Sequence, residues 1–153
     1  MTFIVTALLL LIEIIVSLTF NFNGEVSRNA DIASAGDSMI IYSNYAMAYA
    51  QQNPTVTTTP TVTALNLPSW YVVPKTPAGT ALISAYVQSG KAYTYYTGSI
   101  VGVGGYIAQK MQNGYIAGIN NNGVLASPML PAASTATETI PSQVPNGSTV
   151  LLP

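Results

Sequence analysis

Residues 91–126 read KAYTYYTGSIVGVGGYIAQKMQNGYIAGINNNGVLA, and this stretch decides the fold. The aromatic run at 91–97 predicts a strand, and apolar residues at helical spacing in 99–111 predict a helix. Asn122-Gly123 supplies the positive φ angles of a tight hairpin between two further short strands. The segment therefore predicts a β-α-β-β unit. Its last two strands are residues 115–119 and 124–126.

Less regular segments surround this unit. After it, the proline-punctuated stretch 128–145 predicts irregular chain over the surface, and 148–152 predicts a final edge strand. Before it, 80–89 predicts a short helix or turn that Gly90 ends. Residues 70–73 (WYVV) predict a short strand, in which Trp70 is more often a core anchor than a ligand-stacking residue. Residues 54–64 alternate Thr and Val between prolines, which predicts extended chain or an edge strand.

An amphipathic helix is expected from Glu25 to Asn53, after a break at 21–24. Pro54 ends it, because the residue before a proline is pushed out of the helical region. Apolar and aromatic residues recur at spacings of three and four and form one stripe, which we expect to pack on the sheet. The stripe comprises Ile32, Ala35, Met39, Tyr42, Ala46 and Tyr49.

Residues 1–20 read MTFIVTALLLLIEIIVSLTF, in which Glu13 is the only charged side chain. In a helix, about 20 such residues cover the ~30 Å hydrocarbon core of a membrane. A cleaved signal peptide is disfavoured, because no Lys or Arg precedes the run and no small-x-small cleavage site follows it. We therefore expect a transmembrane anchor at 1–22. Glu13 either contacts a partner helix within the membrane or reaches toward the head groups.

Composition excludes several classes of function. Charged residues make up 6% of the 153 residues and the formal net charge is -1, so no basic surface is available for nucleic acid. The chain has no cysteine and no histidine, which removes thiolate chemistry and the commonest general base and transition-metal ligand. We expect no enzyme activity, no cofactor and no metal.

Two motifs bear on this expectation. Gly36-Asp37-Ser38 is similar to the opening of GDSL-type hydrolases, but a nucleophilic serine needs an adjacent base, normally histidine. The glycines of 101–105 lie between a strand and a helix, as in a dinucleotide-binding loop. Ile107 stands where the last glycine of that motif is required, so close packing of helix on sheet explains the glycines better.

Four segments together resemble the PilM family of small accessory proteins from type IVb pilus systems, the thin pili of conjugative plasmids among them. They are SMIIYSNYAMAYAQQNP (38–54), LPSWY (67–71), YIAGINNNGVLASPML (115–130) and PNGSTVLLP (145–153). The resemblance covers essentially the whole chain. It implies a single-pass protein of the bacterial inner membrane whose domain, residues 23–153, lies in the periplasm. It implies other pilus assembly proteins as partners and offers no catalytic residues.

The expected whole is an α+β protein: an N-terminal transmembrane and amphipathic helix followed by a small, mainly antiparallel sheet domain. We expect it to act through protein contacts in pilus biogenesis, with self-association as a further option. The alternatives are a pilin-like filament subunit, from which the chain departs in lacking a basic leader, and a secreted enzyme. The residues expected at contacts are Glu13, Met39, Tyr42, Tyr49, Tyr93, Tyr95 and Tyr96.

Overall fold

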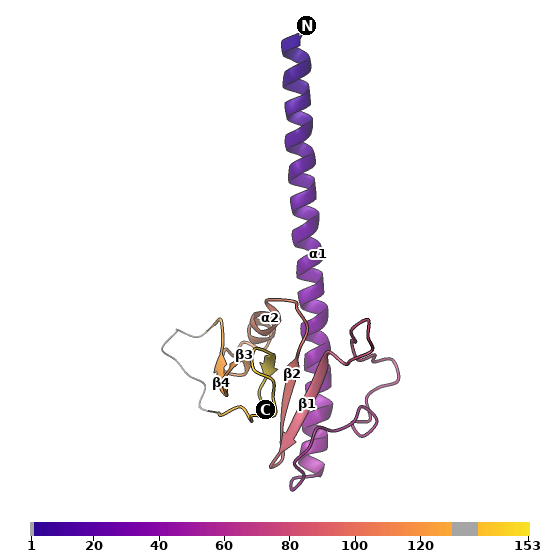
Figure 1. The fold of residues 1–153 in the computed structure, drawn as a ribbon, viewed down its shortest axis with the longest axis vertical. Coiled ribbons are helices and arrows are strands. Elements are labelled where there is room, and N and C mark those ends of the chain that lie inside the picture. The colour runs from indigo at the N-terminus through magenta and orange to yellow at the C-terminus, as the bar shows by residue number, and fades with distance from the viewer. Residues whose placement is uncertain (1, 130–137) are drawn as a thin grey trace. The chain divides into compact units, whose positions relative to one another are not determined.

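The computed structural model describes residues 2–129 and 138–153, and it confirms an α+β fold built on one antiparallel sheet (Figure 1). The chain divides into two compact units, Met1–Asp31 and Ile32–Pro153. The described residues form two helices and five strands. Their bounds are α1 Thr2–Gln52, β1 Ile83–Gln88, β2 Lys91–Tyr96, α2 Val103–Lys110, β3 Ala117–Asn121, β4 Val124–Ala126 and β5 Thr149–Leu151.

The first helix, α1, continues through residues 21–24, so the expected break there is wrong. A glycine inside a helix costs only about 1 kcal/mol relative to alanine, and no proline precedes Pro54. The predicted end of the helix is confirmed. Asn53 follows Gln52, and its side-chain amide donates a hydrogen bond to the Tyr49 carbonyl at 2.9 Å.

In the unit Met1–Asp31, the described side chains are those of residues 11–17 and 24–31, and all are exposed. They include Glu13 and a group of aliphatic residues: Leu11, Ile12, Ile14, Ile15 and Val16. Over the residues described, no helix combines enough length with enough apolar character to cross a membrane. The side chains of 1–10 and 18–23 lie outside the described part of the chain, and the anchor at 1–22 stays a prediction.

The sheet has the strand order β1-β2-β5-β3-β4, and every neighbouring pair is antiparallel. The predicted β-α-β-β unit is confirmed as β2-α2-β3-β4. The last strand, expected at an edge, lies instead in the centre. This strand is antiparallel to both β2 and β3, so the two strands that α2 connects run in the same direction. Leu151 faces Thr94 on one side and Ala117 on the other.

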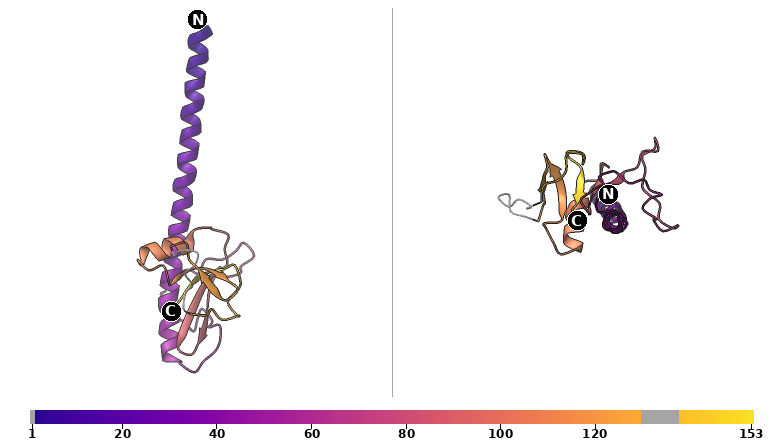
Figure 2. Two further views of the ribbon diagram at one scale, coloured as in Figure 1. Left: turned by 90° about the vertical axis from the view of Figure 1, so that its left-hand side faces the viewer. Right: turned by 90° about the horizontal axis from the view of Figure 1, so that it is seen from below.

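Each face of the sheet has its own core. On one face, the stripe of α1 packs on the sheet together with α2, as predicted (Figure 2). The buried stripe consists of Ala35, Met39, Tyr42, Ala46 and Ala50. On the other face, Ile140 and Val144 of the C-terminal segment cover Tyr86, Tyr93 and Val150. The sheet is thus the middle layer of three.

The hairpin of β1 and β2 replaces the helix or turn expected at 80–89. Ser89 and Gly90 both have positive φ, 51° and 75°, and they close the hairpin beside the Gln88–Lys91 pair. A two-residue turn of this kind matches the twist of the strands it joins. The predicted Asn122-Gly123 turn is confirmed, with φ of 51° and 87°.

The segment from Pro54 to Pro74 carries no regular strand. Thr58 pairs with Val87 through two main-chain hydrogen bonds of 3.0 and 2.8 Å, so the expected extended edge contact is reduced to one bridge. Residues 70–73 join no strand. Trp70 is 69% exposed, so its expected role as a core anchor is wrong. Thr58 already occupies part of the outer edge of β1, and Pro68 and Pro74 flank the tryptophan segment on either side.

Helix α2 and the sheet approach each other at two glycines. A Cβ on Gly104 would lie 3.0 Å from the Gly118 Cα, and a Cβ on Gly118 would overlap the Ala126 carbonyl oxygen. Both positions therefore need glycine for close packing. For Gly104 this agrees with the prediction that the glycines of 101–105 let the helix pack closely on the sheet.

We expect Gly118→Ala to lower the free energy of unfolding by about 1–3 kcal/mol, because the methyl group forces the β3–β4 backbones apart. Urea denaturation of the purified chain measures the change. Gly24→Ala is the matched control, since a Cβ there meets no atom within 4 Å. Equal stability of the two variants would contradict the packing role of Gly118.

Candidate functional site

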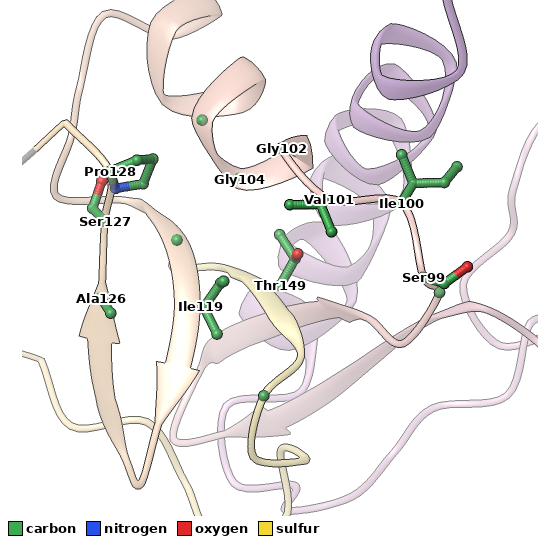
Figure 3. Close-up of a pocket in the computed structure, with 14 residues that line it drawn as sticks. Ser99, Ile100, Val101, Gly102, Gly104, Ile119, Ala126, Ser127, Pro128 and Thr149 are labelled. Atoms are coloured by element: carbon green, nitrogen blue, oxygen red, sulfur yellow. The ribbon is translucent and has the colours of Figure 1, made fainter. Parts of the chain in front are cut away.

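A groove opens on the α2 side of the sheet, between the loop that precedes α2 and strands β3, β4 and β5 (Figure 3). Its volume of about 530 Å³ lies in the range of ligand-binding clefts. The residues that line it share small size or apolar character. They are Gly98, Ser99, Ile100, Val101, Gly102, Gly104, Gly105, Gly118, Ile119, Ala126, Ser127, Pro128, Gly147 and Thr149.

The floor of the groove is one row of the sheet. Strand register sets Ile119 beside Ala126 on β4 and beside Thr149 on β5. One row further along, Ala117 and Leu151 are buried in the core beneath the helices. The helices do not cover the Ile119 row, since Ile119 itself is 47% exposed.

The wall of the groove is the loop that leads into α2. Gly102 takes a left-handed φ of 105° and caps the helix without a side-chain hydrogen bond. This turn carries Val101 on the outside of the loop, 71% exposed, above Thr149 and Ile119 (Figure 3). A Cβ on Gly102 would approach the Ile32 Cδ1 atom to 3.2 Å, so the loop is also packed against α1.

The side chains that line the groove are apolar or carry hydroxyl groups. Its polar side chains are the hydroxyls of Ser99, Ser127 and Thr149, and none of its lining residues carries an ionisable carboxyl or amine. Proton transfer near neutral pH needs a group that titrates there. Within residues 2–129 and 138–153, no cluster of three acidic, histidine or cysteine side chains could hold a metal. The groove suits apolar contacts and hydrogen bonds to glycine main chain.

Comparison with known proteins identifies the family. The PilM family model matches residues 13–152, which is nearly the whole chain. The chain belongs to the PilM family. A PilM protein of Escherichia coli B7A has a similar fold, with a TM-score of 0.54 at 17% identity over 82% of this chain and 93% of that one. A PilM protein of Pseudomonas aeruginosa 2192 has a TM-score of 0.45 at 20% identity over 80% and 94%.

The family assignment confirms the resemblance found in the sequence. No curated protein matches the chain. At 17% identity the Escherichia coli structure supports the fold alone. The roles of individual residues in this PilM-family chain therefore rest on its own geometry.

Each residue of Gly36-Asp37-Ser38 has a structural role. A Cβ on Gly36 would overlap the ring of Tyr106, so glycine lets α2 approach α1. Asp37 accepts hydrogen bonds from Lys110 at 2.6 Å and from the Tyr106 hydroxyl at 2.9 Å. The Lys110 ammonium is the main reason why the pKa of Asp37 lies below its usual value. The Ser38 carbonyl accepts a hydrogen bond from Tyr71, so the motif joins three segments.

The residues expected at contacts lie in different places. Met39, Tyr42 and Tyr96 are buried in the core beneath the helices, and burial raises the pKa of Tyr42 to about 12. Tyr93 is buried on the opposite face of the sheet. Tyr93 and Tyr96 thus fill the two cores and offer little exposed surface for a partner, and their expected role at contacts stays a prediction. The remaining three are partly or fully exposed: Tyr49, Tyr95 and, in the other unit, Glu13.

Tyr93 forms a hydrogen-bonded cluster with Lys91 and Glu138 over the outer face of the sheet. Glu138 accepts hydrogen bonds from Lys91 at 2.6 Å and from the Tyr93 hydroxyl at 2.8 Å. Burial by itself would raise the pKa of Glu138, but the two hydrogen bonds outweigh it and the pKa lies below the usual value. Burial, and then the carboxylate, raise the pKa of Tyr93. These hydrogen bonds fix Glu138 to β2, two residues before Ile140 in the segment that also contains Val144.

Three exposed apolar residues were missed as surface features: Trp70, Val72 and Val101. The apolar run WYVV predicted burial, so the sequence held no signal for the exposure of Trp70 and Val72. The exposure of Val101 could not be predicted either, because it depends on how the loop turns at Gly102.

We expect Glu138→Gln to lower the free energy of unfolding at pH 7 by about 1 kcal/mol. The pKa of Glu138 is lowered by folding, so the contribution is present above the unfolded pKa near 4.5 and is lost as pH falls through the folded value. Urea denaturation between pH 7 and pH 3 measures it. The wild type and the variant should converge at the acidic end.

Asp37→Asn is the control for the Glu138 experiment, since it also removes a carboxylate paired with a lysine but one that is more exposed, at 45% against 25%. Its effect at pH 7 should be smaller. A difference between wild type and Glu138→Gln that stays constant down to pH 3 would show that the carboxylate charge is not responsible.

Proposed function

We propose that the chain is a non-enzymatic component of type IV pilus assembly in the bacterial inner membrane, acting through contacts with other pilus proteins. The observation that carries the proposal is the PilM family match over residues 13–152. It agrees with a groove built of apolar, hydroxyl and glycine surface, which suits binding to a partner protein better than chemistry.

We place residues 1–22 in the membrane as a single-pass anchor and residues 23–153 in the periplasm. The aliphatic side chains between Leu11 and Val16 support the anchor, because each is about half exposed and apolar surface of this kind suits a membrane. The hydroxyl- and amide-rich, lysine-poor composition of the rest supports the periplasmic location.

A filament subunit is the second candidate. One observation favours it: α1 runs from Thr2 to Gln52 as one helix, and its residues from Ile32 onward form the core of the sheet unit. A long N-terminal helix that is apolar first and packed on a sheet later is also the plan of pilin subunits. The two candidates differ in where the protein accumulates.

We expect the full-length chain to remain in the inner-membrane fraction of piliated cells, with Met1 retained, and to be nearly absent from sheared and purified filaments. N-terminal sequencing and immunoblotting of both fractions measure this. Abundance in the filaments would favour the subunit role, and a protein free in solution that begins after Phe22 would exclude the anchor.

The lack of cysteine makes the side of the membrane testable in the same cells. Val124→Cys places a thiol at an exposed position of β4. It should react with a membrane-impermeant maleimide in cells whose outer membrane alone is opened. Thr2→Cys is the control and should react only after the inner membrane is lysed.

A further inference from the structure

Trp70 and Val72 form an apolar knob on the unit Ile32–Pro153. Trp70 lies in a turn that the hydrogen bond from the Tyr71 main-chain N–H to the Pro68 carbonyl closes, and residues 71–73 belong to no helix or strand. Val73 is buried and Tyr71 is half-buried against the core, whereas Trp70 is 69% and Val72 is 80% exposed. The segment thus presents two apolar side chains to solvent, two residues apart in the sequence, while Tyr71 and Val73 pack on the core.

The knob is held in a fixed position. The Tyr71 hydroxyl donates a hydrogen bond to the Ser38 carbonyl of α1 at 2.9 Å, and the Tyr71 main-chain N–H donates one to the Pro68 carbonyl at 2.9 Å. The Trp70 ring stands edge-on to the Tyr71 ring, with centroids 6.2 Å apart. Because these contacts order the segment before any partner arrives, binding through Trp70 costs little conformational entropy.

The groove beside α2 has the properties that such a knob requires. It is uncharged, its volume is about 530 Å³, and Val101 and Ile119 present exposed aliphatic surface at its wall and floor. Glycines make up a large part of the lining and leave main chain open to a flat ring. Large aromatic side chains that fill apolar clefts supply much of the binding energy in protein interfaces.

We propose that Trp70 and Val72 of one copy dock into the groove of a second copy of the chain. The segment that carries the knob and the β3–β4 hairpin that floors the groove lie on opposite sides of α1 (Figures 1 and 2). One copy therefore cannot fill its own groove. The contact joins different surfaces of two copies, so it repeats head to tail and leads to a ring or an open chain of subunits.

Charge favours a second copy as the occupant. No charged residue occurs from Asn53 to Pro74, and none lines the groove, so docking removes no charge from water. In the unit Ile32–Pro153, three lysines stand against Asp37 and Glu138, which gives the side chains a net charge of +1. Copies with so little charge repel each other weakly. The proposal does not depend on the membrane anchor or on the pilus role.

Disulfide cross-linking tests the contact directly, because the natural chain has no cysteine. Two full-length versions with tags of different size are co-expressed, one carrying Val72→Cys and the other Val101→Cys, and lysates are oxidised with copper phenanthroline. We expect a mixed dimer that forms about tenfold faster than the dimer of Val72→Cys with Val124→Cys, because docking raises the effective concentration of one thiol at the other. Val124 is exposed but lies outside the groove.

A second cross-linking experiment places a negative charge in the knob. Trp70→Asp in the Val72→Cys chain should abolish the fast mixed dimer, because a carboxylate would have to enter the uncharged groove. Thr63→Asp is the control, since Thr63 is exposed on the same segment without belonging to the knob, and it should leave the dimer unchanged. Both variants alter exposed side chains, and thermal unfolding checks that they keep the fold.

Three results would overturn the proposal. A Val72→Cys homodimer that forms faster than the mixed dimer would mean that two knobs meet each other. Cross-links of Val72→Cys only to other proteins would assign the knob to a different partner. A fluorescence shift of Trp70, the only tryptophan, on adding lipid vesicles without any shift on raising protein concentration would assign it to a membrane surface. Each result leaves the membrane fractionation of the full-length chain unaffected.

Discussion

Insertion of β5 between β2 and β3 is the contact on which the rest of the fold depends. Without it the sheet consists of two separate hairpins, β1-β2 and β3-β4, and an isolated hairpin is only marginally stable in water. The three residues of β5 supply ladder partners to both hairpins. Val150 enters the core on the outer face and Leu151 the core beneath the helices, so one short strand joins both cores.

The position of β5 also explains the covering of the outer face. Because this strand is fixed in the centre of the sheet, the chain that precedes it must reach the centre from the β4 edge, and residues 138–147 contribute to that path. Ile140 and Val144 lie on it and pack on Tyr86 and Tyr93, while Glu138 is tied to Lys91. The sheet is completed only by residues close to the C-terminus, which makes its closure strongly non-local.

Local chemistry made part of this fold predictable. The strand, helix and hairpin of 91–126 follow from periodicity and from Asn122-Gly123, and the stripe of α1 follows from spacings of three and four. The place of β5 and the exposure of Trp70 depend on which strand edges are already occupied, and a linear pattern does not hold that information. The same is true of the groove, which exists because the helices leave the Ile119 row uncovered.

Scarcity of charge limits the kinds of contact that are open to the unit Ile32–Pro153 of this PilM-family chain. In the unit Ile32–Pro153, four of the five charged side chains form two ion pairs, Asp37–Lys110 and Lys91–Glu138, and each pair joins segments far apart in the sequence. Those four side chains pair with each other within the unit. In this unit, electrostatic steering and charge matching are therefore weak, and contacts depend more on shape and on apolar surface. A rigid tryptophan and a glycine-walled groove are features that supply specificity of this kind.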